Sequence, residues 1–577
     1  SASGKDADSQ MQEQVMRLFI ESLPETSFAK SLQKRSTTIG YDKDVRGAMQ
    51  NKGFDLSAQT AKMESSSKIR DIEKEIDLVY KAGAPKGVDS LVFSRIYKEL
   101  GKRAKFAKTG AENKNVEPYL QRFNQIAFIY TIGFNASSAL VNLSQIPMIV
   151  GPFLTGKFGF DETMSAMTQA AKFVGGAKLS IDEYYDVKEV STTKNGVTTS
   201  DNVYSLKESV EKNIRESIPK KADADAKIAQ FKRMAPMIKA ANERGHIYHS
   251  EMKDMVGVDD LGRGGNKNIF IKGLDTTSTW SAIMFSTAER FNRQTTMTMS
   301  YNLVLDKMDN NKRYYSALKG KFIDVPSDSE SRMYMAADEA IYLTQELNGG
   351  TVLETSSGFS QQGLGRVALM YKSHGMQMYY TMAKSAKLLL DNKFAKDAEG
   401  KQLRSIAIQQ LAGVHLSALL FAGVQGVPLF GAVSMLFDIF FNDDEEDDAR
   451  TWTRKYVGEG WYKGPLTESL GTDVASRIGL SNLLLQSNRF SKDPTIEETI
   501  GFYFGGPALS TARRFERAVK DLGEGEIERG IENLAPAGLT NAWRSTVGRY
   551  QREGGIRTRG YDPIYDDMTG GDLRHRL

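Results

Sequence analysis

The chain has 577 residues, a formal net charge of +4, 26% charged residues and a mean hydropathy of −0.41. Such balanced charge creates no global field that would draw the protein onto DNA or anionic lipid, and the overall polarity excludes a constitutive membrane protein. The absence of cysteine excludes disulfides, thiolate catalysis and cysteine-ligated zinc.

The first 115 residues have the pattern of a helical region. The chain starts SASGKDADSQ, without an initiator Met or a signal-peptide pattern, so we expect Ser1 to be a cut end or a boundary of order. Apolar residues recur at helical spacing over 10–23, 58–81 and 90–105. Residues 1–115 are therefore predicted to form an N-terminal helical region.

A run without charged residues spans 123–156, within a central helical domain predicted over 116–350. Glycine and proline interrupt its second half, which is typical of broken helices. Its asparagine, serine and glutamine side chains would need partners on neighbouring helices if the run entered hydrocarbon. The candidate membrane or subunit contacts in this run are Phe128, Phe134, Leu140, Ile149 and Phe153.

The central domain also contains the clearest β signal in the chain. Asn195-Gly196 lies between β-branched stretches, a pattern that favours a two-residue hairpin turn. Elsewhere the sequence is rich in helix-forming residues and rarely alternates. The predicted fold is mainly α, an extended multi-helical assembly with one β-hairpin near 187–205.

A second charge-free run spans 405–437, and acidic residues at 443–448 follow it closely. It is long enough to cross a bilayer, but glycine and Pro428 break it, and no aromatic belt marks an interface. It is either a buried helical hairpin in a soluble core or a segment that inserts into a membrane at some stage. We predict a helical domain over 351–448 with an apolar hairpin at 405–441. The candidate membrane or subunit contacts here are Leu416, Leu419, Phe421, Pro428, Phe430 and Leu436.

Residues 449–577 are rich in glycine, proline and arginine, and are predicted to form a separate C-terminal region. Arginines accumulate near the chain end, where they offer positive charge to a partner or to phosphate. The candidate phosphate or partner contacts are Arg544, Arg549, Arg552, Arg557 and Arg559.

The sequence carries no legible active site. His246, His249 and Glu251 resemble a metal box only superficially, because the i, i+3 histidine spacing is not that of a zincin. No nucleophile with its base, carboxylate pair or phosphate-binding loop can be recognised. We therefore assign no catalytic, metal or cofactor-binding residue and expect no cofactor.

Many separate blocks of the chain, in the same order, resemble the PLxRFG-type large polyvalent proteins of tailed bacteriophages. The blocks are RLFIESLPETSFAKSLQKRSTTIGYDKDVR, GFNASSALVNLSQIP, AERFNRQ, GVQGVPLFGAV, KYVGEGWYKGP, TDVASRIGLS, GGPALS, RGIENLAPAGLTNAWRS and DPIYDDM. The resemblance implies an internal virion protein, packaged in the capsid and ejected to help form a conduit for the genome across the host envelope. The family supplies no catalytic residues, and its relatives extend beyond both ends of this chain.

The partners that this resemblance implies are further copies of the chain, other internal virion proteins, the portal, packaged DNA and the host membrane. The implied location is the capsid interior, and the host envelope after ejection. Two alternatives remain: the non-catalytic C-terminal portion of a giant virion enzyme such as a virion RNA polymerase, or a peptidoglycan-degrading virion module.

Overall fold

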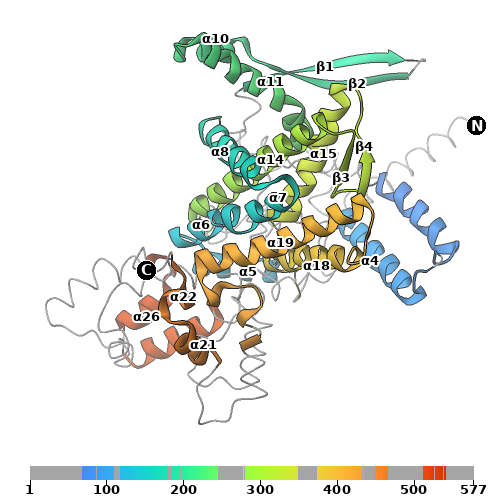
Figure 1. The fold of residues 1–577 in the computed structure, drawn as a ribbon. Helices are drawn as coiled ribbons and strands as arrows, with labels where there is room; N and C mark the ends of the chain where they lie inside the picture. The colour runs from blue at the N-terminus through green and yellow to red at the C-terminus, as the bar shows by residue number, and fades with distance from the viewer. Residues whose placement is uncertain are drawn as a thin grey trace, which may run out of the picture. The chain divides into compact units, whose positions relative to one another are not determined.

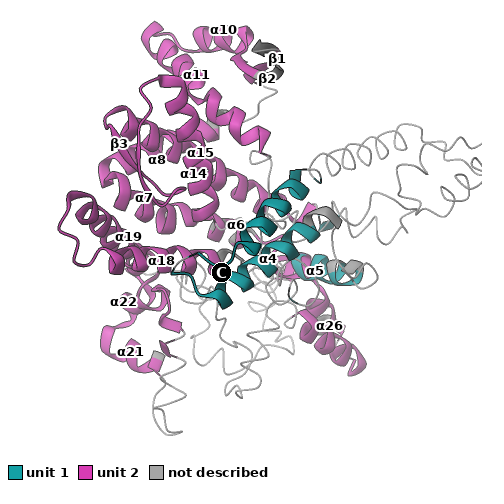
Figure 2. Ribbon diagram, turned by 90° about the vertical axis from the view of Figure 1, so that its right-hand side faces the viewer, with its two compact units in different colours: residues 1–128, 253–279, 352–367 teal, residues 129–252, 280–351, 368–577 magenta. Residues whose placement is uncertain are grey.

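A computed structural model describes residues 66, 68–85, 87–109, 117–177, 184–194, 197–244, 277–278, 280–348, 365, 373–431, 433–434, 449–465, 511–525, 527–536 and 538–540. Contacts divide the chain into two compact units (Figure 2). Unit 1 comprises residues 1–128, 253–279 and 352–367, and unit 2 comprises the remainder. The four regions expected from the sequence stay a prediction.

The described residues are 80% helical, which confirms the mainly α fold (Figure 1). The helical elements of the first half are α4 (Ser90–Thr109), α5 (Glu117–Thr131), α6 (Ala136–Leu143), the π-helical turn η1 (Ile146–Val150), α7 (Gly151–Phe158), α8 (Phe160–Ala177), α10 (Glu208–Ser217) and α11 (Lys221–Glu243). Those of the second half are α14 (Ile283–Asp309), α15 (Ser329–Asn348), α18 (Ser373–Asp391), α19 (Ala398–Ala422), the 3₁₀ turn η3 (Val424–Gly426), α21 (Ala449–Val457), α22 (Glu459–Lys463) and α26 (Ile527–Leu534).

Two antiparallel hairpins complete unit 2. Strands β1 (Tyr185–Lys194) and β2 (Val197–Leu206) pair from Tyr185 opposite Leu206 to Lys194 opposite Val197, as the Asn-Gly turn signal predicts. The second hairpin, β3 (Arg313–Ser316) with β4 (Lys321–Asp324), corrects the expectation of a single one. Its four-residue strands are too short to alternate visibly, and Gly320 closes the turn with a φ of 64°.

The core of unit 2 is organised around α14. This helix packs against α15, α8 and α6, so most of its residues are buried on all sides. Met297, Met299, Tyr301 and Val304 from α14 belong to a continuous apolar cluster that includes residues of α7, α8, α11 and α15. A helix covered from several directions needs no single apolar stripe, which explains its weak amphipathicity.

The two charge-free runs do not form matching hairpins. The run 123–156 is divided among most of α5, then α6, η1 and most of α7, with breaks where glycine and proline interrupt it. The run 405–437 is mostly one long helix, α19, capped by Asp397, which accepts a hydrogen bond from Gly400 N at 2.9 Å. It ends at Gly423, whose φ of 63° suits glycine.

In unit 1, helical residues 68–81 and α4 form an antiparallel pair joined by aromatic contacts. Tyr80 stacks on Tyr97 with ring centroids 3.9 Å apart, and the Tyr97 hydroxyl donates to Asp77 at 2.7 Å. Burial within this pair is slight, because Ile72, Val79 and Leu91 stay exposed. Aromatic stacking and hydrogen bonding therefore carry much of the contact between the two helices.

Candidate functional site

The two charge-free runs meet where α7 crosses α19, within unit 2. Gly156 lies so close to α19 that an added Cβ would stand 2.6 Å from Gln410 Cγ and 2.8 Å from the Gln410 backbone N. On the opposite helix, a Cβ on Gly413 would stand 3.2 Å from Pro152 Cβ. Glycine on both helices thus permits close backbone approach, the arrangement found where helices associate in membranes.

Polar side chains of α19 complete the hydrogen bonding of the broken helix beside it. Pro152 has no N–H, so the Met148 carbonyl four residues earlier lacks its usual helical donor. Ser417 Oγ donates to that carbonyl at 2.8 Å, and Gln410 Nε2 donates to the Phe153 carbonyl at 3.2 Å. The neighbouring helix therefore supplies donors to the run, as the sequence requires for an apolar setting.

The side of α19 that faces away from α7 is exposed, and it carries an apolar row beside the exposed polar residues Gln409 and His415. Ile408, Leu416 and Leu420 are 49%, 57% and 49% exposed, and Ala412 lies on the same i, i+4 row. We call these four residues the α19 ridge. Among the described residues, α19 is the one helix that is long and apolar enough to cross a membrane, and 33% of its most apolar 18-residue window is buried.

The C-terminal end of α19 packs against the segment that contains α22. The backbones of Gly423 and Gly464 pass so close that a Cβ on either residue would collide with the other backbone. Both glycines have positive φ, 63° and 88°, which L side chains rarely adopt. The ring of Phe430 meets that of Tyr462 edge-on at 6.3 Å. Residues 423–430 therefore pack against residues 461–464.

A buried ion pair ties α7 to α15 and to the second hairpin. Lys157 Nζ lies 3.0 Å from Glu339 Oε1, and the two side chains are only 6% and 3% exposed. Glu339 also accepts hydrogen bonds from the Ser316 hydroxyl at 2.7 Å and the Ala317 N–H at 2.6 Å. Further donors are the Tyr314 hydroxyl and the Leu318 N–H, both at 3.3 Å. This carboxylate thus has the partners that a buried charge needs.

These contacts set the ionisation of Glu339. Burial alone would raise the pKa of its carboxyl group, but Lys157, Ser316 and Ala317 outweigh burial and hold that pKa below its ordinary value of 4.5. Glu339 therefore remains charged throughout the neutral range.

The lowered pKa predicts an acid-dependent part of the stability. A carboxyl group whose pKa is depressed by folding stabilises the protein above its unfolded-state pKa, and this contribution is lost as the pH falls through the folded-state pKa. The urea concentration at which half of the wild type is unfolded should therefore fall as the pH drops below about 4.5. In Glu339→Gln the midpoint starts lower, and its decline with acid should be shallower. If the urea midpoints of the two proteins declined equally with falling pH, this assignment would be contradicted.

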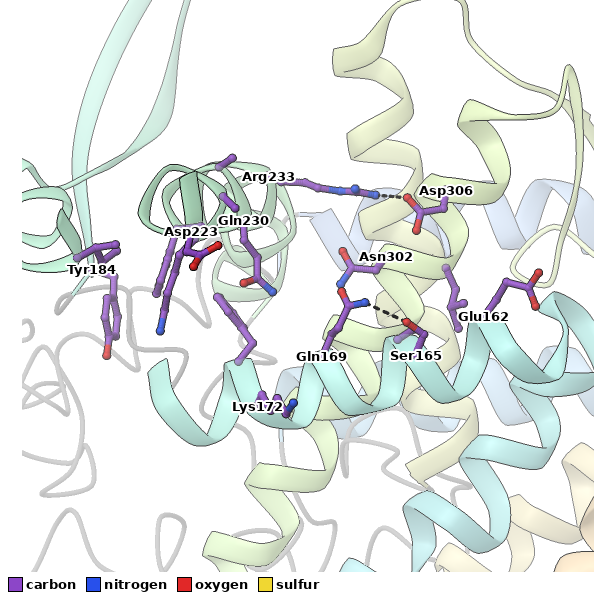
Figure 3. A pocket seen from close by; sticks show the side chains of 18 of the residues that line it. Glu162, Ser165, Gln169, Lys172, Tyr184, Asp223, Gln230, Arg233, Asn302 and Asp306 are labelled. Atoms are coloured by element: carbon purple, nitrogen blue, oxygen red, sulfur yellow. Dashed lines mark hydrogen bonds and ion pairs between the residues drawn. The ribbon is translucent and has the colours of Figure 1, made fainter. Parts of the chain in front are cut away.

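An open cleft of about 1490 Å³ is lined mainly by residues of α8, α10, α11 and α14. Figure 3 shows side chains that line it. Arg233 pairs with Asp306 at 2.5 Å across it, and Gln169 donates to Ser165 at 3.0 Å. Its lining mixes the basic residues Lys172, Lys227, Arg233 and Lys307 with the acidic residues Glu162, Asp223 and Asp306. Mixed charge does not select one ligand class, so we assign no ligand to the cleft.

The structure separates the predicted contact residues by exposure. Leu416 is exposed, whereas Phe134, Leu419, Phe421 and Phe430 are half-buried. Four others are buried side chains: Phe128, Ile149, Phe153 and Pro428. The side chain of Leu140 is not described, and Leu436 lies outside the described residues, as do Arg544, Arg549, Arg552, Arg557 and Arg559 and the stretch that contains His246, His249 and Glu251.

Sequence reasoning missed Lys157 and Glu339. Lys157 directly follows the first charge-free run, so it looks like the solvent boundary of that run. A usable signal is its position between Gly156 and Phe158, inside a stretch that is otherwise apolar. Glu339 gives no such signal, because Asp338 directly precedes it. A charged side chain inside an apolar stretch of a core helix needs a partner when it is buried.

Several blocks that carry the phage-protein resemblance meet in space. Asn292 of AERFNRQ donates through Nδ2 to Asn142 Oδ1 of GFNASSALVNLSQIP at 2.9 Å, and both side chains are buried. Gly538 of the C-terminal block crosses the turn at Phe134 so closely that a Cβ would overlap its carbonyl. No protein-family model, curated protein or solved structure matches this chain. The resemblance therefore rests on the blocks themselves.

Proposed function

We propose that this chain is an internal virion protein of a tailed bacteriophage. It is packaged in the capsid and ejected with the genome, and it helps to form the conduit through the host envelope. The exposed apolar ridge on α19, a helix otherwise held in a well-packed core, is the observation that carries the membrane part of this proposal. The sequence blocks carry the phage assignment.

Helix α19 has two sides of different character. Toward α7, glycine contacts and the Ser417 and Gln410 hydrogen bonds satisfy the backbone without water. Toward solvent, the α19 ridge offers aliphatic side chains that gain free energy on leaving water. In water the ridge is a short apolar row on a chain whose mean hydropathy is −0.41, and contact with lipid covers it. The same packing of α7 on α19 serves both settings.

The double variant Leu416→Asp/Leu420→Asp tests the membrane role. Both side chains are exposed, so the core should stay folded, whereas each aspartate costs about 2.5–3.5 kcal/mol at the centre of a membrane helix. We expect the wild type to bind and permeabilise liposomes of bacterial phospholipids, measured by flotation and dye release, and the variant to lose most of both activities.

The matched control is Ile527→Asp/Ile531→Asp on α26. It alters two exposed isoleucines at the same i, i+4 spacing, and it should leave liposome binding unchanged. Equal loss in both variants, or a wild type that never binds liposomes, would remove the membrane role. Mass spectrometry of purified virions of the source phage tests the virion assignment separately, and we expect peptides of this chain there.

A further inference from the structure

Side-chain hydrogen bonds join the β1–β2 hairpin to α11 at the base of the hairpin. The Tyr185 hydroxyl donates to the Phe231 carbonyl of α11 at 2.8 Å, and Asn242 of α11 donates to the Tyr204 hydroxyl at 3.1 Å. Leu206 is buried beside them. From this base the two ten-residue strands run outward past α11 (Figure 1). The hairpin is therefore an arm with a fixed origin.

The arm has an open strand edge. Within the described residues, β1 and β2 form a two-stranded sheet that no further strand extends. Helix α11 lies along β2, so the outer edge of β1 is the freer one. An open edge presents unpaired N–H and C=O groups, and an isolated two-stranded hairpin is only marginally stable in water. Val187 and Val190 of β1 and Val203 of β2 are also exposed.

We infer that the outer edge of β1 pairs antiparallel with β1 of a second copy of this chain, and that the two hairpins form a four-stranded sheet. This inference rests on the proposed conduit, for which the resemblance implies further copies of the chain, and it names the surface that joins two copies. Pairing of identical surfaces is the commonest way in which soluble proteins form dimers.

The sequence of β1 selects one register for this pairing. A two-fold axis perpendicular to the sheet places one residue opposite its own copy, and only Glu189 or Val190 as that residue gives nearly full overlap of two β1 strands. Centring on Glu189 sets two carboxylates against each other. Centring on Val190 joins two valines and places Asp186 opposite Lys194 of the second copy, twice by symmetry.

In the register of their own hairpin, Asp186 and Lys194 stand directly opposite uncharged residues. Asp186 stands opposite Ser205, and Lys194 stands opposite Val197. Strand β2 offers no equivalent, because residues 197–206 contain Asp201 but no lysine or arginine. Charge complementarity therefore favours the β1 edge and a second copy of this chain as its occupant.

Charge reversal tests the register on the full chain. Sedimentation velocity over a range of concentrations should reveal a wild-type dimer. Asp186→Lys and Lys194→Asp should each raise its Kd by about tenfold, because symmetry turns one substitution into two like-charge contacts. The combined variant Asp186→Lys/Lys194→Asp restores opposite charges and should recover wild-type affinity. Circular dichroism of each variant checks that the fold is retained.

A cysteine placed at the axis gives an independent readout, since the chain has no cysteine of its own. Directly opposed residues on antiparallel strands have Cα atoms about 4.5–5.5 Å apart, within reach of a disulfide. Val190→Cys should therefore form a disulfide-linked dimer under mild oxidation, whereas Val203→Cys on the inner strand should not. A monomeric wild type, equal crosslinking at both positions, or a dimer insensitive to charge reversal would overturn the inference. None of these outcomes bears on whether virions contain the protein.

Discussion

Replacing Glu339 by alanine should destabilise unit 2 by about 3–5 kcal/mol, because the substitution removes one member of a buried ion pair. The loss extends beyond Lys157. The Ser316 hydroxyl and the N–H groups of Ala317 and Leu318 also lose their acceptor, at the turn between β3 and β4. Urea unfolding at neutral pH, followed by circular dichroism, measures the change.

Three variants should differ in how much stability they lose. Lys157→Met should cost less than Glu339→Ala, because methionine fits an apolar site and Glu339 keeps its hydrogen bonds from the second hairpin. Lys387→Ala is the matched control, since it breaks a 2.6 Å pair with Asp391 that is exposed on α18. That control should cost at most about 1 kcal/mol. If Lys157→Met proved the more damaging variant, Glu339 would not be the centre of this cluster.

The second large effect is expected at Gly156. Its Cβ would lie 2.8 Å from a backbone atom of α19, so a side chain forces the two helices apart because a backbone atom cannot swing aside. Gly156→Val should destabilise the protein by at least about 1–3 kcal/mol, the usual cost of overpacking. It should also lower protection of α19 amides in hydrogen exchange, which reports the contact itself.

Gly175→Ala provides the control for Gly156→Val. Gly175 lies near the end of α8, and a Cβ there would meet nothing within 4 Å. Alanine should stabilise that helix by about 0.5–1 kcal/mol, since glycine is the poorer helix former. A similar loss of stability in both variants would mean that the space around the two glycines does not decide the effect. That result would contradict close packing at Gly156.

Local signals in the sequence predict much of the fold. Asn195-Gly196 predicts the β1–β2 hairpin, and apolar periodicity over 90–105 locates α4 to within a few residues. The interruption of the first run at Pro147 and Pro152 also appears, as η1 and α7. These features depend on neighbours in the sequence, which is why they can be read from it.

The candidate site depends on contacts that local patterns do not encode. Nothing near Lys157 specifies Glu339, and nothing near Pro152 specifies Ser417 as the donor to the freed carbonyl. Exposure could not be predicted either: Leu416 and Leu419 are both leucines of one apolar helix, but Leu416 is exposed and Leu419 is half-buried. Which side of α19 faces outward is decided by the position of α7.

The hydrogen bonds from Ser417 and Gln410 oppose movement of α19 along α7. The two donors lie about two turns apart on α19, and their acceptors lie on either side of Pro152. Two hydrogen bonds separated in this way restrict both the sliding and the rotation of α19 relative to α7. A one-turn slide would break both hydrogen bonds and leave the Met148 carbonyl, which faces Pro152 at the i+4 position, among apolar side chains. Sliding of α19 along α7 is therefore opposed by more than the loss of apolar contact.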